Sequence, residues 1–302
     1  METVKVEKVK YNRVLFIINP KSGSRQENRL TNIIASQAKL SKFDFKIYAM
    51  NGDDEENVKL EIDQYQPEVI AAAGGDGTIN FLASLLQHSN IPLLIIPFGS
   101  ANGMAKELGI GNDIELAVSL LETGVEKSID LLAINGNICI HLADVGLNAR
   151  IVKRFEEDPN RGIRTYAKHL LAEMFLLKIY TFHLQCDGRD FKRKAVSLTF
   201  ANASKYGTGA VINPEGLIDD GKFELVIIKP FPQIKLLSIA WKMFNHKLHT
   251  SDYVEIVKCS NARIVSRRKT TLQIDGEVIG KVKQINIEIL PKSLKVIVPK
   301  NA

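Results

Sequence analysis

The sequence predicts an α/β protein whose N-terminal domain is a doubly wound parallel sheet and whose second domain is an antiparallel β-sandwich. Two observations support this prediction. Short apolar runs recur about every 25–30 residues in the first part of the chain, with amphipathic stretches between them, which is the pattern of βαβ units. After about residue 125, strand patterns follow one another with few helical ones, which favours antiparallel pairing. The chain of 302 residues is long enough for two domains.

The first part of the chain is predicted to alternate strands with helices. Strands are predicted at residues 14–18, 45–48, 69–73 and 93–96, and helices at 27–40, 55–65 and 78–86. Ligands of such sheets bind beyond the carboxyl ends of the strands. The loops at residues 19–23, 74–77 and 97–100 follow three of these strands, so we expect one crevice to hold all three loops.

The second part of the chain is predicted to be rich in strands. A hairpin turn at Gly136-Asn137 is expected between strands 128–135 and 138–144. One helix is predicted over 166–178, and Trp241 and Phe244, three residues apart on a later helix, are expected in the core. Further strands are predicted at 182–186, 195–202, 223–228, 253–257, 271–274 and 285–289. We therefore expect domains at 1–125 and 126–290, with a last strand within 291–302 that could join the first domain.

Composition and charge indicate a cytoplasmic protein. Lys and Arg exceed Asp and Glu by 40 to 34, a net charge of +6 that is a weak signal for nucleic acid, so no nucleic-acid partner is expected. The three cysteines, Cys139, Cys186 and Cys259, lie far apart, which indicates reduced thiols. The N-terminus lacks the apolar region of a secretory signal, and the most apolar stretch, 169–184, is too short and too charged to span a bilayer.

Two glycine-containing turns are candidates for phosphate binding. The first, Gly74-Gly75-Asp76-Gly77-Thr78, follows an apolar strand and opens a helix, and the second, residues 97–105, does the same. Each turn alone could be an ordinary capped helix start. Together, at neighbouring strand ends, they could wrap one phosphate chain, because glycine lets phosphate approach the backbone and a helix N-terminus offers free N–H groups. Neither turn matches GxxxxGK[ST] or GxGxxG, and HRD and DFG are absent, which argues against a P-loop ATPase and an ordinary protein kinase.

Two acidic clusters in the second part of the chain each allow two interpretations. Asp219-Asp220 before Gly221 forms either a solvated turn or, through Asp220 and nearby carbonyls, an oxygen site for Mg²⁺. Asp275 and Glu277 flank Gly276 and form either a hairpin with polar tips or a site where one carboxylate accepts a proton from an attacking hydroxyl. In an extended segment these two carboxylates, two residues apart, would point to the same side.

Five motifs in order resemble the diacylglycerol kinase catalytic family, which includes bacterial lipid kinases and is related to sphingosine kinases and NAD kinases. They are Asn19-Pro20-Lys21-Ser22-Gly23, residues 74–80, residues 97–102, Pro214 with Asp220-Gly221, and Asp275-Gly276-Glu277. The order and approximate spacing hold from about Arg13 to Pro299. The resemblance implies an NAD-kinase-like first domain and transfer of the γ-phosphoryl group of ATP to a hydroxyl of a membrane lipid such as diacylglycerol, at the inner face of the membrane.

The resemblance also implies roles for individual residues. Glu277 matches the proton acceptor, Asp275 lies beside it, and Asp76 could help to hold the catalytic Mg–nucleotide. A bound Mg²⁺ would have the carbonyls of Leu217 and Lys222 and the carboxylate of Asp220 as ligands. The matched nucleotide-binding residues are Asn19, Pro20, Ser22, Gly23, Gly74, Gly75, Asp76, Gly77, Thr78, Asn80, Gly99, Ser100 and Asn102.

Four positions depart from the family pattern. Phe81 stands where Glu is expected, Ser100 and Ala49 where Thr is common, and His141 where Asn is common. Two other functions stay open beside a lipid kinase, the second of them because of Phe81 and Ala49. One is a kinase of a soluble substrate such as a nucleotide, and the other is a nucleotide-binding regulator with weak or no turnover.

Overall fold

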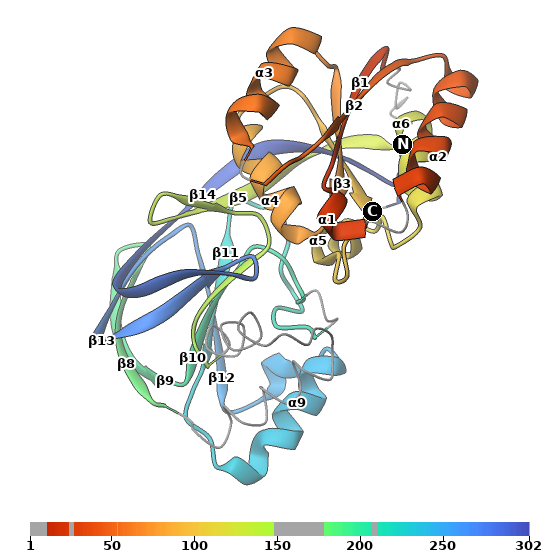
Figure 1. Ribbon diagram of the computed structural model, residues 1–302. Coiled ribbons are helices and arrows are strands. Elements are labelled where there is room, and N and C mark those ends of the chain that lie inside the picture. Colours follow the sequence, from red (N-terminus) through yellow and green to blue (C-terminus); the bar gives the residue numbers. More distant parts are fainter. Residues whose placement is uncertain (1–10, 24–26, 53, 148–177, 207–209, 302) are drawn as a thin grey trace, which may run out of the picture. The chain divides into compact units, whose positions relative to one another are not determined.

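The computed structural model describes residues 11–23, 27–52, 54–147, 178–206 and 210–301 (Figure 1). It has two compact units, Met1–Ile129 with Ser293–Ala302, and Asp130–Lys292. The predicted fold class is confirmed, because a parallel sheet with helices forms the first unit and antiparallel strands dominate the second. Among the described helices, none combines the length and the apolar character needed to cross a membrane.

A parallel sheet forms the centre of the first unit. Its strands are β1 (Arg13–Ile18), β2 (Asp44–Ala49), β3 (Val69–Gly74) and β4 (Leu93–Pro97), in the order β2-β1-β3-β4. The end of β14 (Glu277–Val298) adds a further parallel pairing, because Val296 lies opposite Leu93. Every residue of β3 and β4 is buried, as the continuous apolar runs of these strands require.

Helices follow the strands of this sheet. They are α1 (Pro20–Gly23), α2 (Glu27–Ser41), α3 (Glu55–Tyr65), α4 (Asp76–Leu85), α5 (Gly103–Glu107) and α6 (Ile114–Thr123). α2 buries Leu30, Ile34 and Ala38, which are four residues apart and therefore lie on one side of the helix. Asp113 caps α6, because its carboxylate accepts hydrogen bonds from the N–H groups of Glu115 and Leu116.

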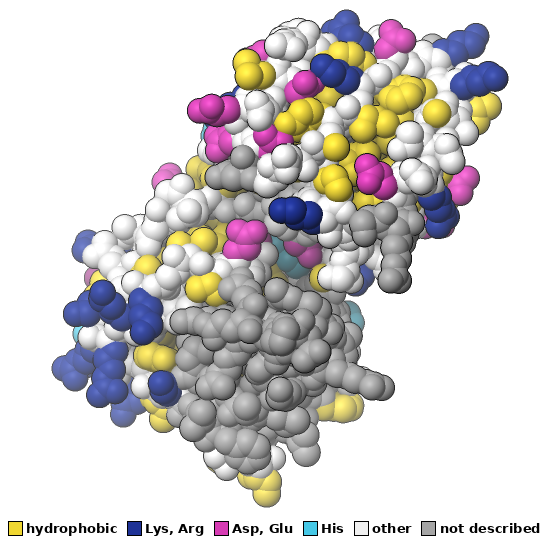
Figure 2. Space-filling model, viewed as in Figure 1, with side chains coloured by type: hydrophobic (Ala, Val, Ile, Leu, Met, Phe, Trp, Pro, Cys, Tyr) yellow, Lys and Arg dark blue, Asp and Glu magenta, His cyan; other side chains and the backbone are white. Residues whose placement is uncertain are grey.

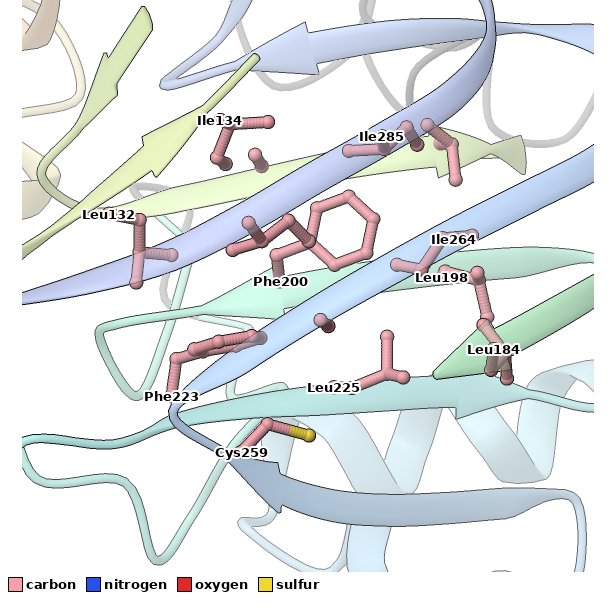
Figure 3. Packing of buried hydrophobic residues seen from close by; sticks show 14 of the residues in the cluster. Leu132, Ile134, Leu184, Leu198, Phe200, Phe223, Leu225, Cys259, Ile264 and Ile285 are labelled. Carbon is pink, nitrogen blue, oxygen red and sulfur yellow. The ribbon is translucent and has the colours of Figure 1, made fainter. Parts of the chain in front are cut away.

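Antiparallel strands build the second unit. They are β5 (Val125–Ile134), β6 (Asn137–Cys139), β7 (Leu142–Gly146), β8 (Tyr180–Cys186), β9 (Arg189–Ala195), β10 (Ser197–Ala201), β11 (Phe223–Ile228), β12 (Val254–Cys259), β13 (Asn261–Ile274) and most of β14. The order is β12-β11-β10-β7-β13-β14, with β8 pairing β13 and β9. Phe200, Phe223 and Leu225 are fully buried where these strands meet (Figure 3). Cys139, Cys186 and Cys259 are free and buried.

Two details of this unit differ from the predictions, and one predicted element lies outside the described residues. The first hairpin turn is Asn135-Gly136, because both residues have positive φ, 49° and 86°, and Ile134 pairs with Asn137. The predicted helix at 166–178 lies outside the described residues up to 177. Trp241 and Phe244 do lie on a helix, α9 (Leu236–Phe244), but they are 56% and 61% exposed, so their expected place in the core is wrong.

The exposure of these two aromatic residues follows from how α9 packs. Two short 3₁₀ turns flank this helix, η1 (Gln233–Lys235) and η2 (Leu248–Thr250). Ile239 of α9 packs with Phe231 and Leu248 in a small core cluster, and all three are buried. The helix therefore already has an apolar inner side, and Trp241 and Phe244 project from the other side.

Candidate active site

The loops after β1, β3 and β4 come together at one edge of the parallel sheet, as their order in the sheet requires. The N–H of Asn19 donates to the carbonyl of Ala73 at 2.9 Å, and the N–H of Phe98 donates to the carbonyl of Gly74 at 3.2 Å. These bonds extend the pairing of β1 and β4 with β3 by one residue each. They place the loops after β1, β3 and β4, which were expected to share one crevice, side by side.

Side chains fix the first two of these loops to each other. The Nδ2 of Asn19 donates to the Oγ1 of Thr78 at 3.0 Å, and its Oδ1 accepts from the N–H of Lys21 at 3.1 Å. A methyl group on Gly74 would lie 2.4 Å from the Cβ of Thr78, so this position requires glycine. Asn19, Gly74 and Thr78 are therefore needed to hold the loops together, whatever else they contact.

Gly75 and Gly99 lie against each other, and their requirements differ. A methyl group on Gly99 would lie 2.5 Å from the Cα of Gly75, which the packing forbids. A methyl group on Gly75 would meet its nearest atom, the Cα of Gly99, at 3.6 Å, and Gly75 has an ordinary φ of −88°. The fold thus requires glycine at 99 and leaves room for a side chain at 75.

Gly75 is also the residue that precedes α4, and no side chain caps this helix. The N-terminus of α4 therefore carries a partial positive charge and N–H groups that suit an anion. Asp76, in the first turn, accepts a hydrogen bond from the N–H of Met104 at 3.2 Å. Gly77 and Asn80, which follow on α4, are partly exposed.

The loop after β4 is held by Asn102. Its Oδ1 accepts from the N–H of Gly99 at 2.8 Å, its Nδ2 donates to the carbonyl of Gly99 at 2.9 Å, and its φ of 51° is left-handed. Ser100 lies exposed within this closed loop. The remaining residues predicted to bind the nucleotide lie in the short helix α1, which begins at Pro20 and ends at Gly23. Ser22 within this helix is partly exposed.

The second unit contains the predicted catalytic acids, on the hairpin between β13 and β14. Asp275 and Gly276 form a two-residue turn in which both φ values are positive, 48° and 92°. Glu277 is exposed and begins β14, opposite Ile274. The expectation that Asp275 and Glu277 share one side of an extended segment is therefore wrong, because the turn separates them.

Asp275 is anchored by backbone groups. Its Oδ1 accepts from the N–H groups of His141 at 3.0 Å and Leu142 at 2.9 Å, and its Oδ2 accepts from the N–H of Ile140 at 2.8 Å. The Sγ of Cys139 lies 3.3 Å from Oδ1, and burial together with the Asp275 charge raises the pKa of this thiol. A carboxylate that accepts this many N–H donors is suited to hold the hairpin in place.

Two buried polar residues that the sequence interpretation missed support the same hairpin. Gln273 accepts from the N–H of Gly276 at 2.8 Å and donates to the Oδ2 of Asp144 at 2.5 Å. The Oδ1 of Asp144 accepts from the hydroxyls of Thr199 and Tyr206. Asp144 is fully buried in β7, and the available signal was an acidic residue inside an otherwise apolar strand.

The residues predicted to bind Mg²⁺ lie in the loop before β11. The Oδ1 of Asp220 accepts from the N–H of Lys222 at 3.0 Å, and its Oδ2 forms an ion pair with the Nζ of Lys258 at 2.5 Å. Hydrogen bonding to Asp220 raises the pKa of Lys258, and burial raises the pKa of the neighbouring Glu224. Leu217 is 57% exposed, and no described cluster of three Asp, Glu, His or Cys side chains could hold a metal ion.

The fit to a resident Mg²⁺ is therefore poor in this arrangement. Both oxygens of Asp220 are engaged, and the Lys258 ammonium supplies the positive charge beside them. A cation could bind Asp220 only in competition with Lys258. Mg²⁺ ligation by Leu217, Asp220 and Lys222 stays a prediction, and we assign no step of the reaction to it.

The same loop is tied to the sheet by Asp130, another residue that the sequence interpretation missed. Asp130 is fully buried and accepts from the N–H groups of Gly221 at 2.6 Å and Lys292 at 2.7 Å. Its own N–H donates to the carbonyl of Ile218 at 2.8 Å. One carboxylate thus fixes the position of the acidic loop.

Comparison with protein families matches both parts of the chain. Residues 13–134 match a diacylglycerol kinase catalytic domain, and residues 142–298 match a YegS C-terminal NAD kinase beta sandwich-like domain. The chain belongs to the diacylglycerol kinase family. The resemblance inferred from the five motifs is thereby confirmed, and family membership supports a phosphotransferase activity.

Relatives and solved structures are similar over most of the chain. A "Probable lipid kinase YegS-like" protein of Citrobacter koseri is 30% identical, over 79% of this chain and 81% of that protein. The "Diacylglycerol kinase" of Bacillus subtilis is 26% identical, over 70% of this chain and 72% of that protein. An uncharacterized protein of Synechocystis sp. is 27% identical over 76% of this chain, which spans about half (54%) of that protein. A diacylglycerol kinase structure from Bacillus anthracis shares the fold, with a TM-score of 0.74 and 20% identity over 97% of this chain and 99% of that one.

Proposed function

We propose that this protein is an ATP-dependent lipid kinase that transfers the γ-phosphoryl group of MgATP to a hydroxyl of a diacylglycerol-like membrane lipid. The observation that carries the proposal is Gly75, which the fold does not require and which leaves the uncapped N-terminus of α4 open to a phosphate. The relatives named lipid kinase and diacylglycerol kinase support the acceptor class.

We propose that the first unit binds the nucleotide. The turn at Gly74, Gly75 and Gly77 offers backbone N–H groups to the phosphates, and Asn19 and Asn102 hold the flanking loops at the same sheet edge. Ser22 is partly exposed and Ser100 is exposed, and their hydroxyls, near this turn, suit phosphate oxygens. Asp76 holds the N-terminus of α5 through Met104 and could face the Mg²⁺ that accompanies ATP as substrate.

We propose that Glu277 is the general base. As the acceptor hydroxyl oxygen forms its bond to the γ-phosphorus, the bond from that phosphorus to the β–γ bridging oxygen breaks, and the hydroxyl proton passes to the Glu277 carboxylate. The products are the phosphorylated lipid and ADP. Glu277 is exposed at the start of β14, so an acceptor hydroxyl can reach its carboxylate, whereas Asp275 is only partly exposed.

One assay distinguishes this function from the two that the sequence leaves open. The protein is incubated with γ-labelled ATP, Mg²⁺ and vesicles that contain diacylglycerol, and the products are extracted with organic solvent. Label in the organic phase supports the lipid kinase. Label in a soluble product indicates a kinase of a soluble substrate, and nucleotide binding without transfer indicates a regulator.

We propose that the lipid kinase activity takes place at the cytoplasmic face of a membrane.

A further inference from the structure

α9 and the turn before it present an exposed apolar surface, which we define by Ile234, Trp241 and Phe244. These side chains are 87%, 56% and 61% exposed, and all three lie within eleven residues. Trp241 and Phe244 are three residues apart and therefore lie on the same side of α9. In Figure 2, hydrophobic side chains emerge at the lower edge of the view, where Figure 1 draws α9. Contiguous exposed apolar patches, when they are large, mark protein, ligand or membrane interaction sites.

This surface cannot turn into the protein, because the opposite side of α9 is already packed. Ile239 is 6% exposed and lies in the core cluster with Phe231 and Leu248. The end of the helix is also fixed, since the Nζ of Lys242 donates to the carbonyl of Thr250 at 2.9 Å. Trp241 and Phe244 are thus held outward on a helix whose other side is packed.

The segment that carries this surface is basic, and the next acid along the chain is Asp252. Residues 229–251 contain four lysines, two histidines and no Asp or Glu. Lys235 is exposed beside Ile234, and the ammonium of Lys247 lies 6.0 Å from the centre of the Trp241 ring. Apolar and aromatic side chains with a basic border are typical of helices that lie in the interface of an anionic bilayer. Trp and Phe are common at protein–protein interfaces and lysine is depleted there, so the lysines are the feature that favours an anionic bilayer over a protein as the partner.

We infer that the surface formed by Ile234, Trp241 and Phe244 docks the protein on an anionic lipid bilayer. α9 has nine residues, too few to span a membrane, so it lies in the plane of the headgroups with these three side chains directed toward the acyl chains. Trp suits this depth because its ring is apolar and its N–H is polar. The inference deepens the proposed function, since it describes how the protein reaches a membrane substrate, but its test needs no catalysis.

Trp241 is the only tryptophan of the chain, so it reports its own environment. The intact protein is titrated, without ATP, with vesicles of phosphatidylglycerol and phosphatidylcholine, and with vesicles of phosphatidylcholine alone. We expect the Trp241 emission to shift to shorter wavelength with the anionic vesicles and much less with the neutral ones. Lipids brominated along the acyl chain should quench this emission. The shift should weaken as the salt concentration rises.

Two variants with matched controls localise the contact. Ile234→Ser and Phe244→Ser remove apolar area and keep the reporter, and each should weaken vesicle binding about tenfold or more. Leu40→Ser and Leu60→Ser make a comparable change at exposed positions of α2 and α3, where Leu40 and Leu60 are 77% and 54% exposed, and should bind like the wild type.

Several results would overturn the inference. One is that anionic vesicles cause no emission shift and do not co-sediment with the protein. Another is that Ile234→Ser and Phe244→Ser bind vesicles as well as the wild type does. A third is that binding is lost only in Lys192→Glu/Lys194→Glu, which would move the contact to the basic residues of β9. An emission shift that depends on protein concentration without vesicles would indicate a second copy of the chain instead. Turnover of a soluble short-chain diacylglycerol, measured on the same variants, tests the proposed function separately and should be unchanged by Phe244→Ser.

Discussion

The backbone of Gly99 lies directly against that of Gly75, and a methyl group on Gly99 would lie 2.5 Å from the Cα of Gly75. The relationship is not symmetric, because a methyl group on Gly75 would have ordinary contacts, the nearest at 3.6 Å. The packing of the two loops thus requires glycine at position 99 but not at position 75. Gly99 serves the close approach of two loops, and we propose that the space at Gly75 receives a phosphate.

This difference predicts opposite outcomes for two alanine variants. Gly75→Ala should keep the thermal midpoint near that of the wild type and weaken binding of an ATP analogue, because the new methyl group occupies the phosphate approach. Gly99→Ala should lower the free energy of unfolding by about 1–3 kcal/mol, as overpacking does. Calorimetric titration and denaturant unfolding measure the two effects. Unchanged nucleotide affinity in folded Gly75→Ala would place the phosphates elsewhere.

A second prediction separates the two acids of the hairpin. Glu277→Gln should reduce turnover about 10²–10⁴-fold, the usual effect of losing a general base, while nucleotide affinity and stability change little, because Glu277 is exposed. The control is Glu288→Gln, an exposed acid further along β14, which should retain full turnover. Near wild-type turnover in Glu277→Gln would remove this residue from the mechanism and leave Asp275 or Asp76 as the base.

Asp275→Asn should act through stability. The amide places an NH₂ group against at least one of the N–H donors of Ile140, His141 and Leu142, so a buried hydrogen bond is lost. We expect the free energy of unfolding to fall by about 1–3 kcal/mol. Turnover should fall as well, because the turn that carries Glu277 loses its anchor. A fully stable Asp275→Asn variant with no turnover would instead give Asp275 a direct catalytic role.

The fold class could be predicted from the sequence because its signals are local. The apolar runs of β1, β3 and β4 and the helical spacing of α2 each occupy a short window of the chain. Even so, one local signal was overlooked, since Asp187-Gly188 forms a two-residue turn between β8 and β9 with φ values of 47° and 78°.

The supports of the candidate site could not be predicted, because their partners are distant in the chain. Asp130 binds the N–H of Lys292, 162 residues away, and Gln273 binds Asp144, 129 residues away. Asp275 was identified as a site residue, yet its anchoring by residues 140–142 depends on a strand pairing across more than 130 residues. Such contacts follow from the register of the sheet, which no local pattern of these segments encodes.

A third prediction concerns Asp220 and Lys258. If the lysine competes with a cation for Asp220, Lys258→Gln should show a larger Mg²⁺-dependent rise of the thermal midpoint than the wild type, because ligand binding stabilises the folded state. Asp220→Asn should abolish the rise in both backgrounds. NaCl at matched ionic strength controls for general screening. If Mg²⁺ raises the thermal midpoint equally in the wild type and in Lys258→Gln, Lys258 does not compete with the ion for Asp220.

The fourth prediction concerns the loop after β2, at the same edge of the parallel sheet. Asp54 is 5% exposed and accepts hydrogen bonds from the hydroxyl of Tyr48, the Nδ2 of Asn57 and the N–H of Asn51. These hydrogen bonds hold the pKa of Asp54 below its ordinary value, and the bond from Tyr48 has the largest effect. The same bond raises the pKa of Tyr48 to about 12. The hydrogen bonds of Asp54 link the end of β2 to the start of α3.

Because the folded state lowers the pKa of Asp54, the ionised carboxylate stabilises the fold. This stabilisation is fully present above the unfolded pKa of about 4 and is lost as the pH falls through the lower folded value. Asp54→Asn should therefore lower the thermal midpoint at pH 7, and its difference from the wild type should shrink steadily below pH about 4. Asp63→Asn, a change at an exposed residue of the same helix, controls for the loss of one charge. A difference between Asp54→Asn and the wild type that stays constant down to pH about 2 would show that the hydrogen bonds do not depend on the ionised form.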